Sequence, residues 1–348
     1  RCWFIISCSG AAIFQTTLPS PKYLQIMDNL SPNTPFWLRN GHADTIFAKF
    51  LQRPSPAYRR ELLPDSTGKA QVAYDFVDSP NPDAPLVVLF HGLEGSSQSH
   101  YAVELMRAVQ DKGWNGVVAH FRSCGGIPNT APVFYHLGDT PEIAFMLDTL
   151  AARYPVIYAA GVSLGGNALA KYLGEQGGNA LPRAAAVISA PVDATLAGTR
   201  FDKGMSRLLY TRYFLNSLLP KARNVAGLQN AHPDRNVAAL LKQCKTLGDF
   251  DDTFTAPLHG FVDRFDYYRR ASCKPWLKKV TSPLLLLNAV NDPFLPPEAL
   301  PNVNEVSPSV TLLQPEHGGH VGFVSRDGGR LNLQWLPQTV LSYFAQFE

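Results

Sequence analysis

A serine flanked by glycines is the first residue of this chain that suggests chemistry. Ser163 lies in the hexamer 161–166, Gly-Val-Ser-Leu-Gly-Gly, which contains the pattern Gly-x-Ser-x-Gly between an apolar run and a stretch of helical composition. Such a serine has strained backbone angles at the tip of a sharp turn, and side chains at Gly161 or Gly165 would clash there. The pattern predicts Ser163 as a nucleophile, although a glycine-rich turn around an ordinary serine has the same letters.

A serine hydroxyl is a poor nucleophile at neutral pH, so it needs a base and a third group that orients the base. Asp292 comes three residues after the apolar run 284–289, and His320 lies in the loop that follows the apolar run 310–313. The order Ser163, Asp292, His320 is the one associated with α/β-hydrolases. We therefore assign His320 as the base and Asp292 as the orienting acid.

Other side chains compete for these two roles. His317 is nearer the expected strand, and we interpret it as orienting the loop or facing solvent, whereas two glycines before His320 could deliver that ring to the serine. Asp292 stands before Pro293, and Asp-Pro is also an ordinary turn pair, but its position and order favour the acid. The competing acids are Asp249, Asp251, Asp252 and Glu316.

The oxyanion of acyl transfer needs two N–H donors that are held in place beforehand. One is the backbone N–H of Leu164, directly after the nucleophile. The other should come from the loop after the apolar run 86–90, where His91-Gly92 permits close backbone approach, and it is then the N–H of Leu93. His91-Gly92 could also be a tight turn with a structural histidine, which is compatible with this role of Leu93.

Other chemistries have weaker support. His91, His317, His320 and Asp292 could converge on a cation, but no helix-spaced ligand pair is present, so we expect no metal. The hexamer lacks the spacing of a dinucleotide loop and there is no phosphate loop, so we expect no cofactor. A formal net charge of +3 without a basic run argues against nucleic acid.

Strands that alternate with helices surround these residues and predict an α/β fold with a mainly parallel sheet flanked by helices. In such a sheet, reactive groups gather at the carboxyl ends of the strands. Thr140 as N-cap with Pro141 and Glu142, and Gly113 as a C-terminal cap, mark two of the helices. The expected elements are a hairpin over 58–78 with its turn at 65–68, strands 86–90, 116–121, 155–160, 184–189, 284–289 and 310–313, and helices 101–112, 140–151 and 337–347.

The alternation stops between residues 191 and 279. We expect an α/β-hydrolase core of residues 27–190 and 280–348, with residues 191–279 as an inserted helical cap. The stretch 207–219 is rich in leucine, aromatic residues and arginine and would form an amphipathic helix. It could line an acyl-chain pocket or face a membrane, but we favour leucines that pack on the domain.

Residues 1–26 are not assigned to the domain. Residues 2–14 are mostly apolar but too short to span a bilayer, and the chain begins with Arg while Met27 precedes the first domain-like sequence. We expect a disordered extension or a start-site artefact. The five cysteines are far apart, which favours a reducing compartment and a cytoplasmic protein. The alternative is a genuine signal segment, and the protein would then be secreted or lipid-anchored.

Taken together, these motifs resemble the YheT-like branch of the α/β-hydrolase superfamily, the AB-hydrolase-4 family, over roughly residues 35–347. The resemblance rests on His91-Gly92-Leu93-Glu94-Gly95-Ser96, on residues 161–167, on Asn291-Asp292-Pro293-Phe294, on residues 316–323, and on residues 250–252 and 266–268. It implies a carboxylic-ester hydrolase with the triad Ser163, Asp292 and His320. Eukaryotic relatives act on lipid esters, including phospholipids with medium-length acyl chains.

The sequence therefore predicts a serine esterase that cleaves a short- to medium-chain acyl or lipid ester through an acyl-enzyme. A thioesterase or amidase would use the same triad, and a non-catalytic lipid-binding protein on a hydrolase fold is the alternative from another class. The expected partner is a small-molecule acyl ester or lipid. Membrane contact is allowed but not indicated, and the oligomeric state does not follow from the residues.

Overall fold

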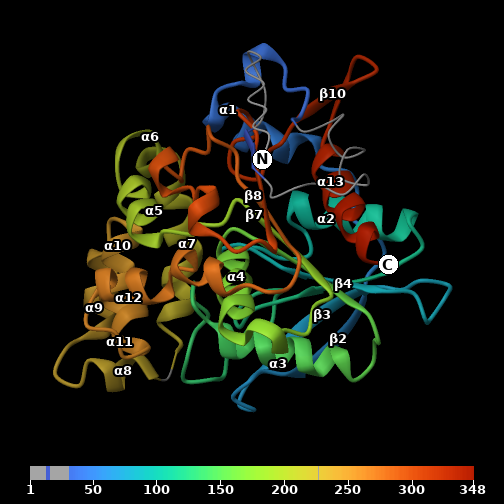
Figure 1. Ribbon diagram of the computed structural model, residues 1–348. Helices are drawn as coiled ribbons and strands as arrows, with labels where there is room; N and C mark the ends of the chain where they lie inside the picture. The colour runs from blue at the N-terminus through green and yellow to red at the C-terminus, as the bar shows by residue number, and fades with distance from the viewer. Residues whose placement is uncertain (1–12, 16–30, 226) are drawn as a thin grey trace.

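A nine-stranded sheet forms the centre of the computed structural model, which describes residues 13–15, 31–225 and 227–348 (Figure 1). The strand order is β1-β9-β8-β7-β6-β4-β5-β3-β2, with β4 to β9 parallel and β1, β2 and β3 antiparallel to their neighbours. The predicted mainly parallel sheet is confirmed. The strands are β1 (Ile13–Gln15), β2 (Arg59–Pro64), β3 (Gln71–Val77), β4 (Leu86–Phe90), β5 (Asn115–Ala119), β6 (Ile157–Val162), β7 (Ala184–Ile188), β8 (Leu284–Leu287) and β9 (Val310–Gln314).

Helices cover both faces of this sheet. The helices α2 (His100–Asp111) and α13 (Trp335–Phe344) pack on one face, and α3 (Thr140–Ala151) and α4 (Leu164–Gln176) pack on the other. Alternate side chains of β4 enter the two layers: Val87 and Leu89 face α2 and α13, while the others face α3 and α4. A strand covered on both faces needs an unbroken apolar run, and that run is the pattern from which the strand was predicted.

Between β7 and β8 the described residues form helices and turns. This β7–β8 segment (residues 189–283) is the group of helices on the left of Figure 1. The predicted helix 207–219 runs further, as a π-helical turn and then α7 to Ala222. The elements are α5 (Ala194–Phe201), α6 (Gly204–Ser206), η5 (Arg207–Thr211), α7 (Arg212–Ala222), α8 (Gly227–Ala231), α9 (Val237–Gln243), α10 (Leu247–Phe250), η6 (Asp251–Thr255), α11 (Ala256–Leu258), α12 (Arg264–Ala271) and η7 (Lys274–Lys279).

Short elements complete the chain. The helix α1 (Gly41–Phe47) continues into η3 (Ala48–Leu51), and a small hairpin joins β10 (Ser325–Asp327) to β11 (Arg330–Asn332). The remaining short helices are η2 (Phe36–Leu38), η4 (Gly177–Asn179), η8 (Pro297–Ala299), η9 (Val303–Glu305) and η10 (Ala345–Phe347).

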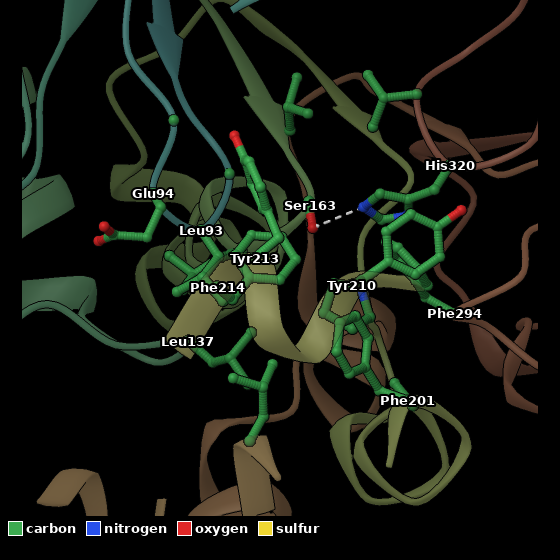
Figure 2. Close-up of a pocket in the computed structure, with 18 of the residues that line it drawn as sticks. Leu93, Glu94, Leu137, Ser163, Phe201, Tyr210, Tyr213, Phe214, Phe294 and His320 are labelled. Atoms are coloured by element: carbon green, nitrogen blue, oxygen red, sulfur yellow. Dashed lines mark hydrogen bonds between the residues drawn. The ribbon is translucent and has the colours of Figure 1, made fainter. Parts of the chain in front are cut away.

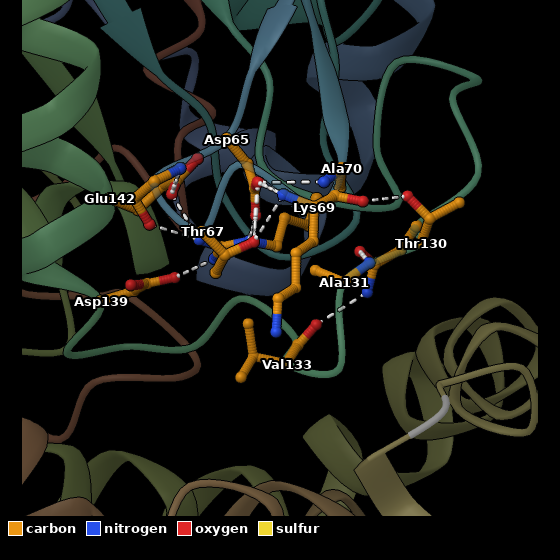
Figure 3. Close-up of polar contacts among 12 residues, drawn as sticks. Asp65, Thr67, Lys69, Ala70, Thr130, Ala131, Val133, Asp139 and Glu142 are labelled. Carbon is orange, nitrogen blue, oxygen red and sulfur yellow. Dashed lines mark hydrogen bonds and ion pairs between the residues drawn. The ribbon is translucent and has the colours of Figure 1, made fainter.

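One buried arginine connects the turn of the β2–β3 hairpin to the start of α3, through three carboxylates that Figure 3 labels: Asp65, Asp139 and Glu142. The guanidinium of Arg122 donates to Asp65 at 2.6 Å, to Asp139 at 2.9 Å and to Glu142. Burial raises the pKa of Asp139 and Glu142, and Arg122 opposes that shift. The helix α3 spans the predicted residues, but its N-cap is Asp139, which pairs with Arg122, and the predicted N-cap Thr140 is its first residue.

The predicted extension over residues 1–26 lies outside the described residues, apart from β1, which pairs with β9 at the sheet edge. Within the described residues, no helix combines the length and the apolar character that crossing a membrane requires. Cys124, Cys244 and Cys273 are buried free thiols.

Candidate active site

Ser163 occupies a sharp turn between the end of β6 and the start of α4. Its backbone has φ 52° and ψ −117°, a strained conformation for a residue with a side chain. A Cβ atom at Gly161 would lie 2.7 Å from the carbonyl oxygen of Gly165, and one at Gly165 would lie 2.5 Å from the carbonyl oxygens of Phe90 and His91. Crowding within the turn therefore requires Gly161, and crowding against the end of β4 requires Gly165.

A hydrogen-bond chain links Ser163 to the predicted acid and base. His320 Nδ1 lies 2.8 Å from Asp292 Oδ2. His320 Nε2 lies 3.0 Å from Ser163 Oγ, and Figure 2 marks this second contact with a dashed line. An ionised carboxylate only accepts, so Nδ1 carries the proton and Nε2 is left to accept from the serine hydroxyl. The Asp292 side chain is buried, its Oδ1 accepts the N–H of Phe294 at 2.8 Å, and the Phe294 ring packs 4.4 Å from the imidazole.

Asp292 lies further beyond its strand than predicted, because β8 ends at Leu287 rather than at residue 289. The competing groups are bound elsewhere. His317 Nε2 lies 3.8 Å from Glu316 on the same loop. The other acids contact Thr246 (Asp249), Tyr268 and Thr255 (Asp251) and Arg264 (Asp252). In the part of the chain that the structure describes, no group of three His, Cys, Asp or Glu side chains could hold a metal ion.

Two residues that the sequence analysis did not identify hold the loop of His320. The N–H of His320 donates to Thr45 Oγ1 at 2.8 Å, and the Thr45 hydroxyl donates to the carbonyl of Gly41 at 2.6 Å. His100 Nε2 donates to the carbonyl of Val321 at 2.8 Å, and burial lowers the pKa of His100 to about 4, so the ring is neutral at pH 7. Thr45 and His100 come from α1 and α2, and no local pattern relates them to residue 320.

The loop after β4 orients the backbone N–H of Leu93. His91 Nε2 accepts the N–H of Phe121 at 3.1 Å, so Nδ1 carries the proton and donates to the Gly92 carbonyl at 2.7 Å. Because the C=O and N–H of a trans peptide point in opposite directions, this bond also fixes the direction of the Leu93 N–H. Neither this N–H nor that of Leu164, the first residue of α4, has an acceptor within the described residues.

Glu94 ties the same loop to α7 in the β7–β8 segment. The Glu94 N–H donates to the Tyr135 hydroxyl at 2.9 Å, and that hydroxyl donates to Glu94 Oε1 at 2.8 Å. The other carboxylate oxygen pairs with Lys221 Nζ at 2.7 Å and accepts from Ser217, both on α7. The peptide after Leu93 is therefore held by a buried tyrosine and by a helix of the overlying segment.

A cavity of about 710 Å³ opens above Ser163 and His320. It lies between the loops at the sheet edge and the helices of the β7–β8 segment. Figure 2 shows aromatic rings from that segment pointing toward the serine. Its apolar lining includes Leu137, Phe201, Phe214, Leu218, Phe250 and Phe294.

The fold agrees with the comparison to known families. Residues 85–327 match the family model described as alpha/beta hydrolase fold, so the chain belongs to the α/β-hydrolase family. A solved esterase from Pyrococcus furiosus superposes with a TM-score of 0.52 over 85% of this chain and 96% of that chain, at 16% identity, a likeness of fold alone.

Relatives with higher sequence identity indicate the branch of the family to which the chain is similar. The chain is 38% identical to YheT of Escherichia coli (strain K12), a protein provisionally named an esterase, over 88% of this chain and 91% of that protein. It is 30% identical to human phospholipase ABHD3 over 83% of this chain and 72% of that protein. The resemblance to the YheT-like branch is thus confirmed.

Proposed function

We propose that this protein is a serine hydrolase that cleaves a carboxylic ester, with Ser163, His320 and Asp292 as its catalytic triad. The observation that carries the proposal is the hydrogen-bond chain from Asp292 through His320 to a serine whose backbone is strained at the strand end. A nucleophile, its base and the group that orients the base are thus linked one after another at hydrogen-bond distances. The names of the relatives, esterase and phospholipase, support the same reaction class.

In the acylation step, Ser163 Oγ attacks the ester carbonyl carbon while its proton passes to His320 Nε2. The carbonyl oxygen becomes an oxyanion, and the N–H groups of Leu93 and Leu164 donate to it. Asp292 stabilises the imidazolium that forms and holds the ring in place. Collapse of the tetrahedral intermediate breaks the bond to the alcohol oxygen, and His320 gives its proton to the departing alcohol.

In the deacylation step, a water molecule attacks the acyl-enzyme carbonyl and gives a proton to His320 Nε2. The same two N–H groups stabilise the second oxyanion. The bond between Ser163 Oγ and the acyl carbon then breaks, and the proton returns from His320 to the serine. The products are a carboxylic acid and the regenerated enzyme.

The cavity supports a proposal for the substrate class. Its lining of phenylalanine and leucine favours an apolar acyl chain rather than a charged group, and its size accommodates a short- to medium-chain acyl or lipid ester. We also propose that residues 191–279 are a cap on a core of residues 27–190 and 280–348. Phe201, Phe214 and Phe250 all come from this cap, so the cap would select the chain length.

Steady-state kinetics on p-nitrophenyl esters of graded chain length tests the proposal. Ser163→Ala should lower kcat/KM by at least about 10³-fold on every ester, because the nucleophile is lost. Ser342→Ala, an exposed serine on α13, serves as the matched control and should be unchanged. Retained turnover in Ser163→Ala would refute the assignment.

The same kinetic assay distinguishes the alternative functions. A thioesterase or amidase would show its higher kcat/KM on a thioester or amide of the same acyl chain. A non-catalytic lipid-binding protein would show no Ser163-dependent turnover on any of these substrates. The strained turn and the bonded base favour the enzyme, because binding alone requires neither.

A further inference from the structure

Exposed apolar side chains surround the mouth of the cavity. Phe50 on η3 is 78% exposed, Leu208 on η5 is 74% exposed, and Tyr213 on α7 is 60% exposed. Large apolar groups in water are unfavourable unless something covers them, and a contiguous group of them marks an interaction site. We call this group the mouth rim; its members are Ile46, Phe50, Met205, Leu208, Leu209 and Tyr213.

The two segments that carry the mouth rim touch each other. Lys49 Nζ lies 4.5 Å from the centroid of the Tyr213 ring, and His42 Nδ1 lies 3.2 Å from the Tyr210 hydroxyl. Ile46, Leu209 and Tyr213 also line the cavity. The rim is therefore continuous from η3 to η5 and leads directly into the space above Ser163.

On the cap side of the mouth rim, the charged residues of the stretch 203–233 are all basic. Residues 203–233 contain five basic residues and no Asp or Glu. Of the basic residues, Lys203, Arg207 and Arg212 are exposed and form no ion pair within the described residues. Arginines interspersed with exposed leucine, methionine and tyrosine are the composition of an element that lies in a lipid interface.

The leucines of this stretch divide between two environments. Leu215 and Leu218 pack into the core, as the interpretation of the sequence expected. Leu208 points outward, and packing on the domain does not account for it. The apolar outer surface thus belongs to the rim and is not a by-product of a buried helix face.

We propose that the mouth rim docks this protein on an anionic lipid membrane. Rim side chains would enter the boundary between headgroups and acyl chains, and Lys203, Arg207 and Arg212 would bind the negative headgroups. The apolar entrance favours a lipid surface over a protein partner, since an acyl chain could pass from the bilayer into the cavity without crossing water. Docking itself does not need the proposed esterase activity, whereas delivery of an ester lipid to Ser163 rests on it.

Vesicle sedimentation of the full chain tests the docking. Ser163→Ala is the parent protein, so that no lipid is consumed, and the vesicles are phosphatidylcholine alone or with about one fifth phosphatidylglycerol. We expect binding to the anionic vesicles that weakens with salt and is much weaker without phosphatidylglycerol. Arg207→Glu and Arg212→Glu should each weaken it by about fivefold or more, and Phe50→Ser with Leu208→Ser should weaken it on both vesicle types.

Matched controls lie elsewhere on the surface. Val262, 89% exposed between α11 and α12, and Lys242 on α9 are not part of the rim or the cavity lining, so Val262→Ser and Lys242→Glu should bind like the parent. Failure of the parent to bind anionic vesicles, or rim variants that bind as the controls do, would overturn the proposal. A dimer in light scattering that Leu208→Ser dissociates would assign the rim to self-association instead.

The same substitutions are also made in the protein that retains Ser163, and its hydrolysis of a soluble short-chain ester is measured. This measurement distinguishes the docking proposal from the esterase proposal. The Phe50 and Leu208 side chains do not line the cavity, so these rates should match wild type. Vesicle binding without ester hydrolysis would remove the esterase proposal alone, and hydrolysis without vesicle binding would remove the docking proposal alone.

Discussion

Removing the hydroxyl of Tyr135, a residue that also lines the cavity, should slow catalysis through the donor loop while the triad stays in place. This hydroxyl accepts the Glu94 N–H at 2.9 Å and donates to the Glu94 carboxylate at 2.8 Å, so it holds the peptide that follows the proposed oxyanion donor Leu93. The ring itself stacks on Phe121 at 5.5 Å, and Tyr135→Phe leaves that contact in place. The substitution therefore loosens the donor loop selectively.

The expected changes in kcat and in the free energy of unfolding each follow from a known effect. Losing an oxyanion donor outright lowers kcat by about 10²–10³-fold. A donor that is present but less well held costs less, and we expect kcat of Tyr135→Phe to fall by roughly 10- to 100-fold with little change in KM. The partly buried Glu94 N–H also loses its acceptor, which should lower the free energy of unfolding by about 1 kcal/mol or more.

Tyr172→Phe is the matched control. Tyr172 is also a buried tyrosine whose hydroxyl accepts a backbone N–H, that of Leu181 at 3.4 Å, but it lies on α4 outside the cavity lining. Kinetics on a p-nitrophenyl ester and urea unfolding of both variants separate catalysis from stability. Equal kcat values in the two variants would refute the role of the donor loop.

Three further substitutions, together with an exposed control for the second, test the triad and the buried charges. Asp292→Asn should lower kcat by about 10⁴-fold with the protein still folded, because an amide at this position favours the wrong imidazole tautomer of His320; ester kinetics with circular dichroism checks this. Arg122→Met should lower the free energy of unfolding by about 3–5 kcal/mol in urea, since it leaves buried carboxyls without their cation. Arg153→Met, which breaks an exposed pair with Glu61, should lose less than about 1 kcal/mol. Burial raises the pKa of Asp44 from its usual 3.8 to about 7, so the folded state binds the proton more tightly and the stability this provides is lost as pH rises from about 4 to 7. Asp44→Asn should therefore gain stability relative to wild type between about pH 5 and about pH 8, and a pH-independent difference in Tm would contradict this.

The parallel core and the position of the candidate triad were predictable for one physical reason. Strands buried on both faces are unbroken apolar runs, as β4 and β8 are, and parallel strands collect at one edge whatever follows their carboxyl ends. Ser163, Asp292 and His320 each follow such a run. The positions of the three residues in the sequence, each after a predicted strand, therefore predicted that they lie close together. The strand predicted at β8 was two residues longer than β8 is.

The supporting contacts were not predictable because they join segments that no local pattern relates. Thr45, His100 and Tyr135 reach the site from α1, α2 and the chain before α3, and each forms a hydrogen bond to a backbone group of a site loop. The outward direction of Leu208 was missed for a related reason. Leucines on an amphipathic stretch are usually inside, and only the position of the β7–β8 segment relative to α1 and η3 shows which of them remain exposed to water.

The most direct test of the central claim is covalent labelling of the native protein with a fluorophosphonate, followed by peptide mass spectrometry. The phosphorus reacts with an activated serine, so we predict one adduct, located on Ser163, that is absent in Ser163→Ala and strongly slowed in His320→Gln. Exposed Ser342 should remain unmodified. A protein that stays unlabelled at Ser163, or that labels equally fast without His320, would contradict the proposed serine hydrolase.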